Sequence, residues 1–388
     1  MWPAVSYESH SWRPSGDGTS RRSRQRHTGP YEAAVVPRIA EESIELPSAV
    51  AGEVEEAATA LARADATLSA SGFHALPAVL MRTESTSSSQ IERLTASARS
   101  LAIAELGEVT GDNALSVVAH VRAMQTALGW SGAVDTGALV DIHDVLIEPD
   151  PVHEPGIRNE QVWIGGEGTG PHRADFVPPH HARIPDAMAD LDTFIARADM
   201  PIIAQVAIAH AQFETIHPFT DGNGRTGRTL IHMMLRDAGL TRGSAIPISA
   251  GLLHQTDAYI AALMDYRRGD VIPIVEQVAR AAIFASALTE DLSDRVQLLE
   301  SEWRGRLHAR RGAAVWRLLE LLPARPAVNY ELVMTELGVT SRTAYDAIAA
   351  LEDAGILTST SGHRRNRVWV APEVLEALDE FAERARRR

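Results

Sequence analysis

Apolar residues recur at helical spacing along most of the 388-residue chain, and glycines and prolines mark the breaks in the pattern. This spacing gathers the apolar side chains on one face of each helix, where they can be buried. The pattern therefore predicts a mainly α protein, with helices over residues 50–71, 113–128, 136–146, 184–198, 202–216, 252–265, 271–304, 314–322, 330–337 and 341–354.

Two segments depart from helical spacing. Short β-prone runs, separated by glycines and ended by Pro178 and Pro179, predict a β-hairpin within residues 161–179. Residues 1–30 are rich in Ser, Gly and Arg and have almost no periodic apolar content, which predicts a disordered tail. A nucleic-acid-binding arm is the alternative for that tail.

The C-terminal residues 313–388 show a different rhythm. Three short helices are followed by β-prone runs at residues 356–360 and 367–370, an order typical of a winged-helix domain. The turn between the two runs is locally basic, which favours contact with DNA through Arg364, Arg365 and Arg367. The helix before it is more acidic than basic, which favours a protein-interaction or homodimerisation role instead: it carries Arg342 against Asp346, Glu352 and Asp353.

Composition narrows the chemistry. The chain has no cysteine, which excludes disulfides, thiolate metal sites and cysteine nucleophiles. It also has no lysine, which excludes the P-loop, the kinase-type nucleotide site and Schiff-base chemistry. The net charge of −14 gives no general attraction to nucleic acids or acidic membranes. No signal peptide and no apolar run of membrane-spanning length are evident, so a cytoplasmic protein without membrane contact is expected.

The most informative stretch is residues 217–228, His-Pro-Phe-Thr-Asp-Gly-Asn-Gly-Arg-Thr-Gly-Arg, which lies between two helical segments. Gly222 and Gly224 let backbone N–H groups approach an anion, and the N-terminus of the following helix adds its positive end. Arg225 and Arg228 share one face of that helix, so both can point at bound phosphates. The stretch therefore predicts a phosphate-binding loop.

Two further side chains give the loop chemistry. Asp221, at its entrance, is suited to hold Mg²⁺, which takes one or two carboxylates together with phosphate oxygens. His217, at the end of the first helix, is placed to act as a general base. The alternative is a glycine-rich turn with incidental charges, which does not account for a base, a carboxylate and two arginines within twelve residues.

At these residues the chain resembles the Fic family, whose motif reads His-x-Phe-x-Asp/Glu-Gly-Asn-Gly-Arg-x-x-Arg; every fixed position is present. The resemblance extends over residues 31–290 and implies a Fic-type helical core with the hairpin as a flap. It implies transfer of AMP from ATP, with Mg²⁺, to a protein Ser, Thr or Tyr hydroxyl. His217 would take the hydroxyl proton, and Asp221 would hold Mg²⁺. Phosphate contacts are implied for Gly222, Asn223, Gly224, Arg225 and Arg228.

Ser88 and Glu92 lie four residues apart and share one face of a predicted helix. Taken alone, they could belong to a Ser-capped surface helix with an exposed Glu. The run Ser-Ser-Gln-Ile-Glu at residues 88–92 is similar to the inhibitory helix of many Fic proteins, although Arg93 stands where Gly or Asn is usual. The resemblance implies that Glu92 pairs with Arg228 and occupies the guanidinium that would otherwise hold the γ-phosphate.

The resemblance also implies a docking place for the target protein at residues 161–177, where a target segment would add as a strand. Self-modification is a second outcome of the same chemistry. Two alternatives remain: a DNA-binding regulator that uses the core as a nucleotide sensor, and an enzyme that uses another donor or removes AMP. The expected layout is a disordered tail (1–30), an N-terminal helical region with the inhibitory helix (31–110), the Fic core (111–290), a linker helix (291–312) and the winged-helix domain (313–388).

Overall fold

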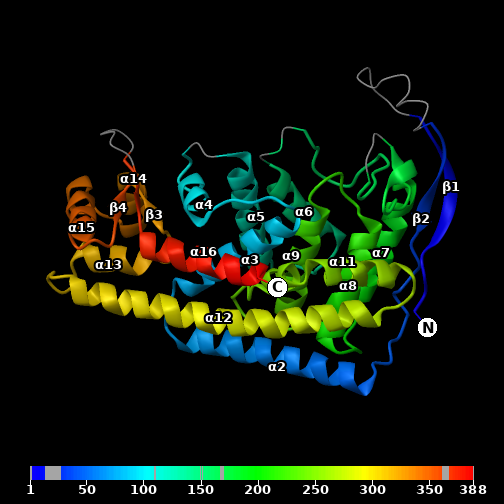
Figure 1. The fold of residues 1–388 in the computed structure, drawn as a ribbon, viewed down its shortest axis with the longest axis horizontal. Coiled ribbons are helices and arrows are strands. Elements are labelled where there is room, and N and C mark those ends of the chain that lie inside the picture. The colour runs from blue at the N-terminus through cyan, green and yellow to red at the C-terminus, as the bar shows by residue number, and fades with distance from the viewer. Residues whose placement is uncertain are drawn as a thin grey trace. The chain divides into compact units, whose positions relative to one another are not determined.

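The protein is mainly α, as predicted, in a computed structural model that describes residues 2–13, 28–108, 111–148, 150, 152–166, 170–360 and 367–387 (Figure 1). Its contacts divide the chain into two compact units, and each unit is assembled from three separate stretches. The units therefore interleave along the sequence, whereas the layout expected from the sequence was consecutive. The first unit takes residues 1–55, 129–238 and 257–279, and the second takes 56–128, 239–256 and 280–388.

The first unit is built around α8 (Ile202–Ile216), which is followed by α9 (Asn223–Asp237). Every residue of α8 from Ile203 onward is buried, and most of these side chains are apolar or small. It packs against α7 and α9, and α6 packs against both of these helices. The remaining helices of this unit are α6 (Thr136–Ile147), α7 (Ile184–Ile195), α11 (Thr256–Arg267) and the short 3₁₀ turns η1 (Pro171–Arg173) and η2 (His181–Arg183).

The prediction of a disordered tail over residues 1–30 is wrong for residues 2–13. β1 (Ser6–Trp12) pairs antiparallel with β2 (Gly29–Val35), with Ser6 opposite Val35 (Figure 1). Tertiary contacts order this strand: the Trp12 ring packs edge-on against Trp163 at 5.4 Å between centroids. The local composition does not reveal partners that lie far away in sequence. Residues 14–27 lie outside the described part.

The predicted hairpin within residues 161–179 is reduced to a single antiparallel bridge between Ile164 and Phe176. The Ile164 N–H donates to the Phe176 carbonyl at 2.8 Å, and the Asp175 N–H donates to the Ile164 carbonyl at 2.9 Å. Gly166 follows with φ +77°, and an added Cβ there would lie 2.1 Å from the Arg173 carbonyl oxygen. The two runs therefore approach closely beside the bridge. Residues 167–169 lie outside the described part.

The second unit has its own apolar core, in which Trp303 and Trp369 are almost fully buried. Trp303 donates a hydrogen bond to Glu373, so its indole N–H is satisfied. The helices that contribute to this unit are α2 (Ser48–Ala70), α3 (Leu76–Ile91), α4 (Ala98–Ala104), α5 (Asp112–Gly129), α10 (Ile248–His254), α12 (Ile272–Arg306), α13 (Ala314–Leu321), α14 (Tyr330–Leu337), α15 (Ser341–Asp353) and α16 (Pro372–Arg386); α2 and α12 also contribute residues to the first unit.

The C-terminal residues contain the predicted elements and two more, one of which is the short strand β3 (Ala327–Val328). α13, α14 and α15 lie where predicted, and β3, β5 (Trp369–Val370) and β4 (Thr358–Ser359) form an antiparallel sheet in that order. α16 was not predicted. Residues 361–366, which include Arg364 and Arg365, lie outside the described part, so the winged-helix assignment stays a prediction.

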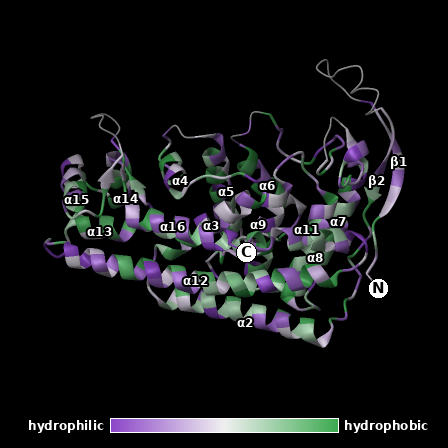
Figure 2. Ribbon diagram, viewed as in Figure 1, coloured by the Kyte–Doolittle hydropathy of each residue, from purple (hydrophilic) through white to green (hydrophobic). Residues whose placement is uncertain are grey.

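Among the described residues, one helix, α12, is long and apolar enough by length and composition to cross a membrane. In its most apolar window, 61% of the residues are buried inside the protein, and the core helix of a soluble protein passes the same test. Figure 2 shows hydrophilic residues recurring along the helix.

Gly251 on α10 offers a test of how closely this helix packs against α12. An added Cβ would lie 2.5 Å from the Cα and carbonyl oxygen of Ala281, and backbone atoms cannot move aside cheaply. We expect Gly251→Ala to lower the free energy of unfolding by about 1–3 kcal/mol. Gly52→Ala is the matched control, because Gly52 lies within α2 with nothing within 4 Å of an added Cβ.

The control should raise the free energy of unfolding by about 0.5–1 kcal/mol, the usual gain from replacing Gly by Ala in a helix. Urea unfolding followed by circular dichroism measures both variants. Equal shifts of the same sign would contradict the close approach of α10 and α12.

Candidate active site

The loop of residues 217–222 reverses the chain between α8 and α9. His217 ends α8 in the left-handed region, with φ 52° and ψ 62°, and its N–H still donates to the Phe213 carbonyl at 2.8 Å. Gly222 is also left-handed, with φ +75°, and an added Cβ would lie 3.0 Å from Leu146. α9 then begins at Asn223. The predicted helix, glycine loop and helix are confirmed, and Gly224 and Arg225 lie in the first turn of α9.

Asn223 closes the loop on itself. Its Nδ2 donates to the Phe219 carbonyl at 2.8 Å, and its Oδ1 accepts from the Phe219 N–H at 2.9 Å. Phe219 is buried, so its side chain anchors the loop in the core. The structure thus gives Asn223 a role in shaping the loop, and its contact with a phosphate oxygen stays a prediction.

His143 on α6 fixes the other side of the loop. Its Nε2–H donates to the Asp221 carbonyl at 3.0 Å, because a carbonyl oxygen can only accept, which leaves Nδ1 as the acceptor for the Gly156 N–H at 3.4 Å. The ring stacks on Phe219 with 3.8 Å between centroids and 10° between planes. Burial lowers the pKa of His143, which favours this neutral form. The helix pattern predicted α6 but gave no sign of this contact.

Arg158 is a second residue that the sequence did not single out. Its side chain is buried, and its three nitrogens donate to backbone carbonyls: Nε to His217 at 2.8 Å, NH1 to Glu160 at 2.7 Å and NH2 to Pro179 at 2.7 Å. Burial lowers its pKa to about 10, which still leaves it charged at neutral pH. Arg158 therefore holds the His217 backbone and places a positive charge beside its ring.

The imidazole of His217 is held in its neutral form. Enclosure of the ring by the protein, followed by the positive charges of Arg158 and Arg267, lowers the pKa of His217 to about 3. Its imidazole is therefore neutral near pH 7, which is the form that a general base requires.

Asp221 and Arg225 form an ion pair across the first turn of α9. Arg225 NH2 donates to Asp221 Oδ2 at 2.8 Å; the Arg225 side chain is 6% exposed and that of Asp221 is 45% exposed. The predicted metal ligand is thus the more accessible partner. Arg228, further along α9, is fully buried. The contacts of Arg225 and Arg228 with phosphates stay predictions.

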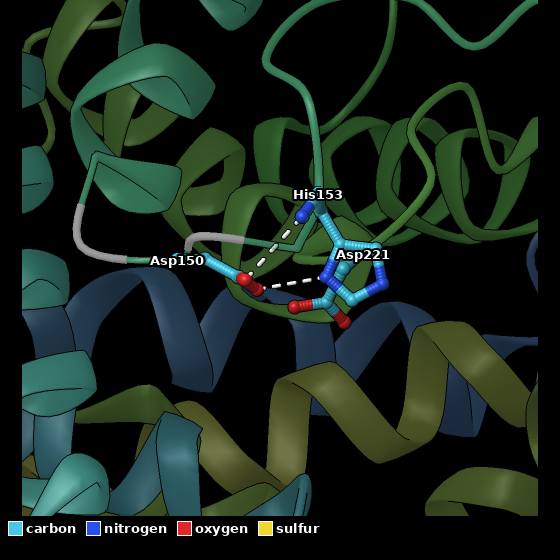
Figure 3. A group of neighbouring side chains, drawn as sticks. All are labelled: Asp150, His153 and Asp221. Atoms are coloured by element: carbon cyan, nitrogen blue, oxygen red, sulfur yellow. Dashed lines mark hydrogen bonds and ion pairs between the residues drawn. The ribbon is translucent and has the colours of Figure 1, made fainter.

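Two residues from the segment after α6 join Asp221. Asp150, His153 and Asp221 each offer a ligand atom, and these atoms all lie within 4.8 Å of one another. Figure 3 shows the three side chains gathered at one place. Carboxylate oxygens are the donors that Mg²⁺ prefers, so Asp221 and Asp150 fit the implied ion. The sequence pointed only to Asp221, because the other two residues lie about seventy positions earlier in the chain.

The predicted inhibitory residues lie on α3, in the second unit. Ser88 is buried within this helix, and Glu92 is its C-cap. Arg93 takes up the left-handed conformation, with φ 63°, which is usually the place of Gly or Asn. The Leu94 N–H donates to the Ser89 carbonyl at 3.0 Å, as at many helix ends that turn through a left-handed residue. The helix therefore ends as it would with glycine, although the residue is arginine.

Of the three arginines predicted to contact DNA, the structure describes Arg367, which is paired with an acidic residue, as is Arg342 on the preceding helix. Arg367 NH2 donates to Glu352 at 3.1 Å, and Arg342 pairs with Asp346 at 3.1 Å on α15. These carboxylates offset positive charge that phosphate binding would need.

Comparison with known proteins identifies the domain that holds the loop. Residues 133–235 match the Fic/DOC family. The chain contains a Fic domain. Over 136 residues it is 32% identical to protein adenylyltransferase fic-1 of Caenorhabditis briggsae, and this match covers 35% of this chain and 24% of that protein. Over 183 residues it is 30% identical to protein adenylyltransferase Fic of Nematostella vectensis, which covers 46% of this chain and 38% of that protein.

The chain thus spans well under half the length of these curated relatives. A crystal structure of a Fic family protein from Desulfovibrio desulfuricans G20 has a similar fold, with a TM-score of 0.56 and 20% identity. The match covers 84% of this chain and 97% of that one. This match supports the mainly helical fold and concerns the fold alone.

His210 on α8 connects this helix to α9 and α11 through two hydrogen bonds. The ring is fully buried; Nδ1–H donates to the Gly227 carbonyl at 2.9 Å, which leaves Nε2 to accept from the Tyr259 hydroxyl at 2.7 Å. Both ring nitrogens are thereby used in the neutral form. Burial, followed by the charge of Arg228, lowers the pKa of His210 from 6.5 to about 3.

This arrangement predicts a pH dependence of stability. The folded pKa lies below the unfolded value of 6.5, so the contribution of His210 is complete above pH 6.5 and is lost as the pH falls toward 3. In that window the unfolded chain is protonated at His210 while the folded chain is not. The free energy of unfolding therefore falls by about 1.4 kcal/mol for each unit of pH. Urea unfolding at pH 7.5, 6 and 5 should give a shallower decline for His210→Gln than for wild type. Parallel declines would contradict a neutral buried His210.

Proposed function

We propose that the protein transfers AMP from ATP to a Ser, Thr or Tyr hydroxyl of a target protein or of itself, and releases pyrophosphate. The observation that carries this proposal is the loop of residues 217–222, which sets a neutral imidazole at the end of one helix and a carboxylate at the entrance of the next. The names of the relatives support the same reaction.

Each residue of the loop has a role in this reaction. His217 takes the proton of the attacking hydroxyl, for which its ring has to be neutral, as it is near pH 7. The N-terminus of α9, with the amides of Gly222 and Gly224, receives negative phosphate oxygens. Mg²⁺ held by Asp221 would neutralise charge on the α- and β-phosphates. Arg225 and Arg228 complete the grip on the β- and γ-phosphates.

The ion pair between Arg225 and Asp221 holds both side chains in place before a nucleotide binds. Each holds the other in place at 2.8 Å, so neither charge is isolated in the partly enclosed loop. When a nucleotide and an ion are both bound, this pair can be replaced by two new ones, phosphate with Arg225 and metal with Asp221. The target segment is proposed to dock along residues 161–177, where backbone groups can register an extended peptide.

Mass spectrometry of the full chain after incubation with Mg²⁺ and ATP tests the reaction. We expect His217→Ala to lower AMP incorporation by about 10²- to 10⁴-fold, the usual range for loss of a general base. His74→Ala is the matched control, because His74 is exposed and lies in the second unit. Undiminished incorporation in His217→Ala would exclude His217 as the base.

We further propose that Glu92 keeps the enzyme weakly active by pairing with Arg228. A carboxylate at the C-terminal end of a helix is unfavourable toward the helix dipole, so its position at the cap of α3 suggests a role other than stability. The sequence run at residues 88–92 supports the same role. While Glu92 occupies the guanidinium, the γ-phosphate is misplaced and the α-phosphate is poorly set for attack.

We expect Glu92→Gly and Glu92→Gln to raise AMP incorporation by at least about tenfold, because a charge-assisted bond of about 1.5–3 kcal/mol is removed. Arg93→Gly is the control: it relaxes the left-handed position at the helix end and leaves the Glu92 charge in place. Labelled ATP measures the rates. An increase in AMP incorporation with Arg93→Gly would assign the inhibition to the helix end. No increase with either Glu92 variant would assign it to another group.

Transfer from another donor is the alternative reaction for the same loop, so the nucleotide needs a test of its own. Incubation with ATP, GTP, UTP and CDP-choline, read by mass, separates transfer of AMP from transfer of another phosphate-bearing group. No observation in the described residues favours the DNA-binding regulator, since Arg342 and Arg367 are engaged by carboxylates.

A further inference from the structure

Asp150, His153 and Asp221 form a mixed group of ligands that extends beyond the family motif. Asp221 comes from the motif loop, and the other two come from the segment between α6 and the Ile164 bridge. Their ligand atoms lie within 4.8 Å of one another (Figure 3). One ion with ligands at about 2.0–2.2 Å spans opposite ligands about 4.4 Å apart, so only a small adjustment is needed.

Hydrogen bonds fix the side chains of Asp150 and His153 in place. Asp150 Oδ1 accepts from the Val152 N–H at 2.8 Å and from the His153 N–H at 3.3 Å, which fixes the carboxylate. Asp150 Oδ2 lies 2.7 Å from His153 Nδ1, so the imidazole is oriented as well. On the opposite side, the bond from His143 to the Asp221 carbonyl holds the motif loop. Both halves of the group are therefore held by the protein before an ion binds.

The charges favour a dication. Two carboxylates face one guanidinium, that of Arg225, which occupies only Asp221 Oδ2. Asp221 Oδ1 and the second ring nitrogen of His153 remain as donor positions. All three side chains are partly exposed, which gives an ion a way in.

The type of donor indicates the type of ion. Mg²⁺ takes oxygen ligands almost exclusively and is usually bound by one or two carboxylates. An imidazole nitrogen shifts preference toward transition metals, whose affinities for nitrogen sites exceed that of Mg²⁺. Two carboxylates and one imidazole leave three positions of an octahedral ion for water or phosphate oxygens.

We propose that Asp150, His153 and Asp221 together bind a divalent transition-metal ion such as Mn²⁺ in preference to Mg²⁺, and that this ion is held before any nucleotide arrives. The binding rests on these three side chains alone. Only the use of the ion against phosphate oxygens rests on the proposed function.

Titration of the full chain with Mn²⁺ in the absence of nucleotide tests the site. Electron paramagnetic resonance measures free Mn²⁺, whose signal falls as the ion is bound. We expect one tight site per chain, weakened by about 10- to 100-fold in His153→Ala and in Asp150→Asn. Glu154→Gln is the control, because Glu154 is exposed, adjacent to His153 and outside the group. Circular dichroism confirms that each variant is folded.

Competition with Mg²⁺ tests the role of the imidazole. His153→Asp keeps three ligands but makes all of them oxygen, so Mg²⁺ should displace Mn²⁺ from this variant at about tenfold lower concentration than from wild type. Absence of tight Mn²⁺ binding to wild type, or equal weakening by Glu154→Gln and His153→Ala, would overturn the proposal. A Glu92→Gly protein that binds Mn²⁺ but transfers no AMP would support this site and contradict the proposed function.

Discussion

The left-handed turn at His217 is the constraint on which the rest of the site depends. A non-glycine residue in this conformation is unfavourable by about 1 kcal/mol or more, so surrounding contacts must hold it. Arg158 supplies two of these contacts. Its side-chain Nε donates to the His217 carbonyl at 2.8 Å, and its backbone N–H donates to the Pro218 carbonyl at 2.9 Å. The turn directs the chain toward α6, where His143 and the close approach at Gly222 fix Asp221 and the start of α9.

The same contacts determine the charges of the site. Arg158 is buried and charged, and its side-chain nitrogens donate to three backbone carbonyls. Enclosure of the His217 ring by the protein, and after it the positive charge of Arg158, keeps the imidazole neutral. Asp221 lies on the exposed side of the loop and is balanced by Arg225. A neutral imidazole, an exposed carboxylate and a buried guanidinium are thus placed within one loop and the first turn of the helix that follows it.

The proposed inhibitory helix belongs to a different compact unit from the motif. Within the second unit, Glu84 of α3 accepts from the N–H and hydroxyl of Ser249, and Arg82 pairs with Glu105 at 2.7 Å and donates to the Ala324 carbonyl at 2.6 Å. α3 is therefore part of the core that also includes the C-terminal residues.

The sequence by itself determined the mainly α class, most helix positions and the twelve motif residues, because helical period and the chemistry of a contiguous loop are written in neighbouring residues. It missed the strand at residues 6–12 and gave no sign of His143, Arg158, Asp150 or His153. Only the tertiary structure decided these, since each acts through a partner that folding brings from dozens of residues away. Hydrogen-bond partners across a fold depend on packing, which local periodicity does not encode.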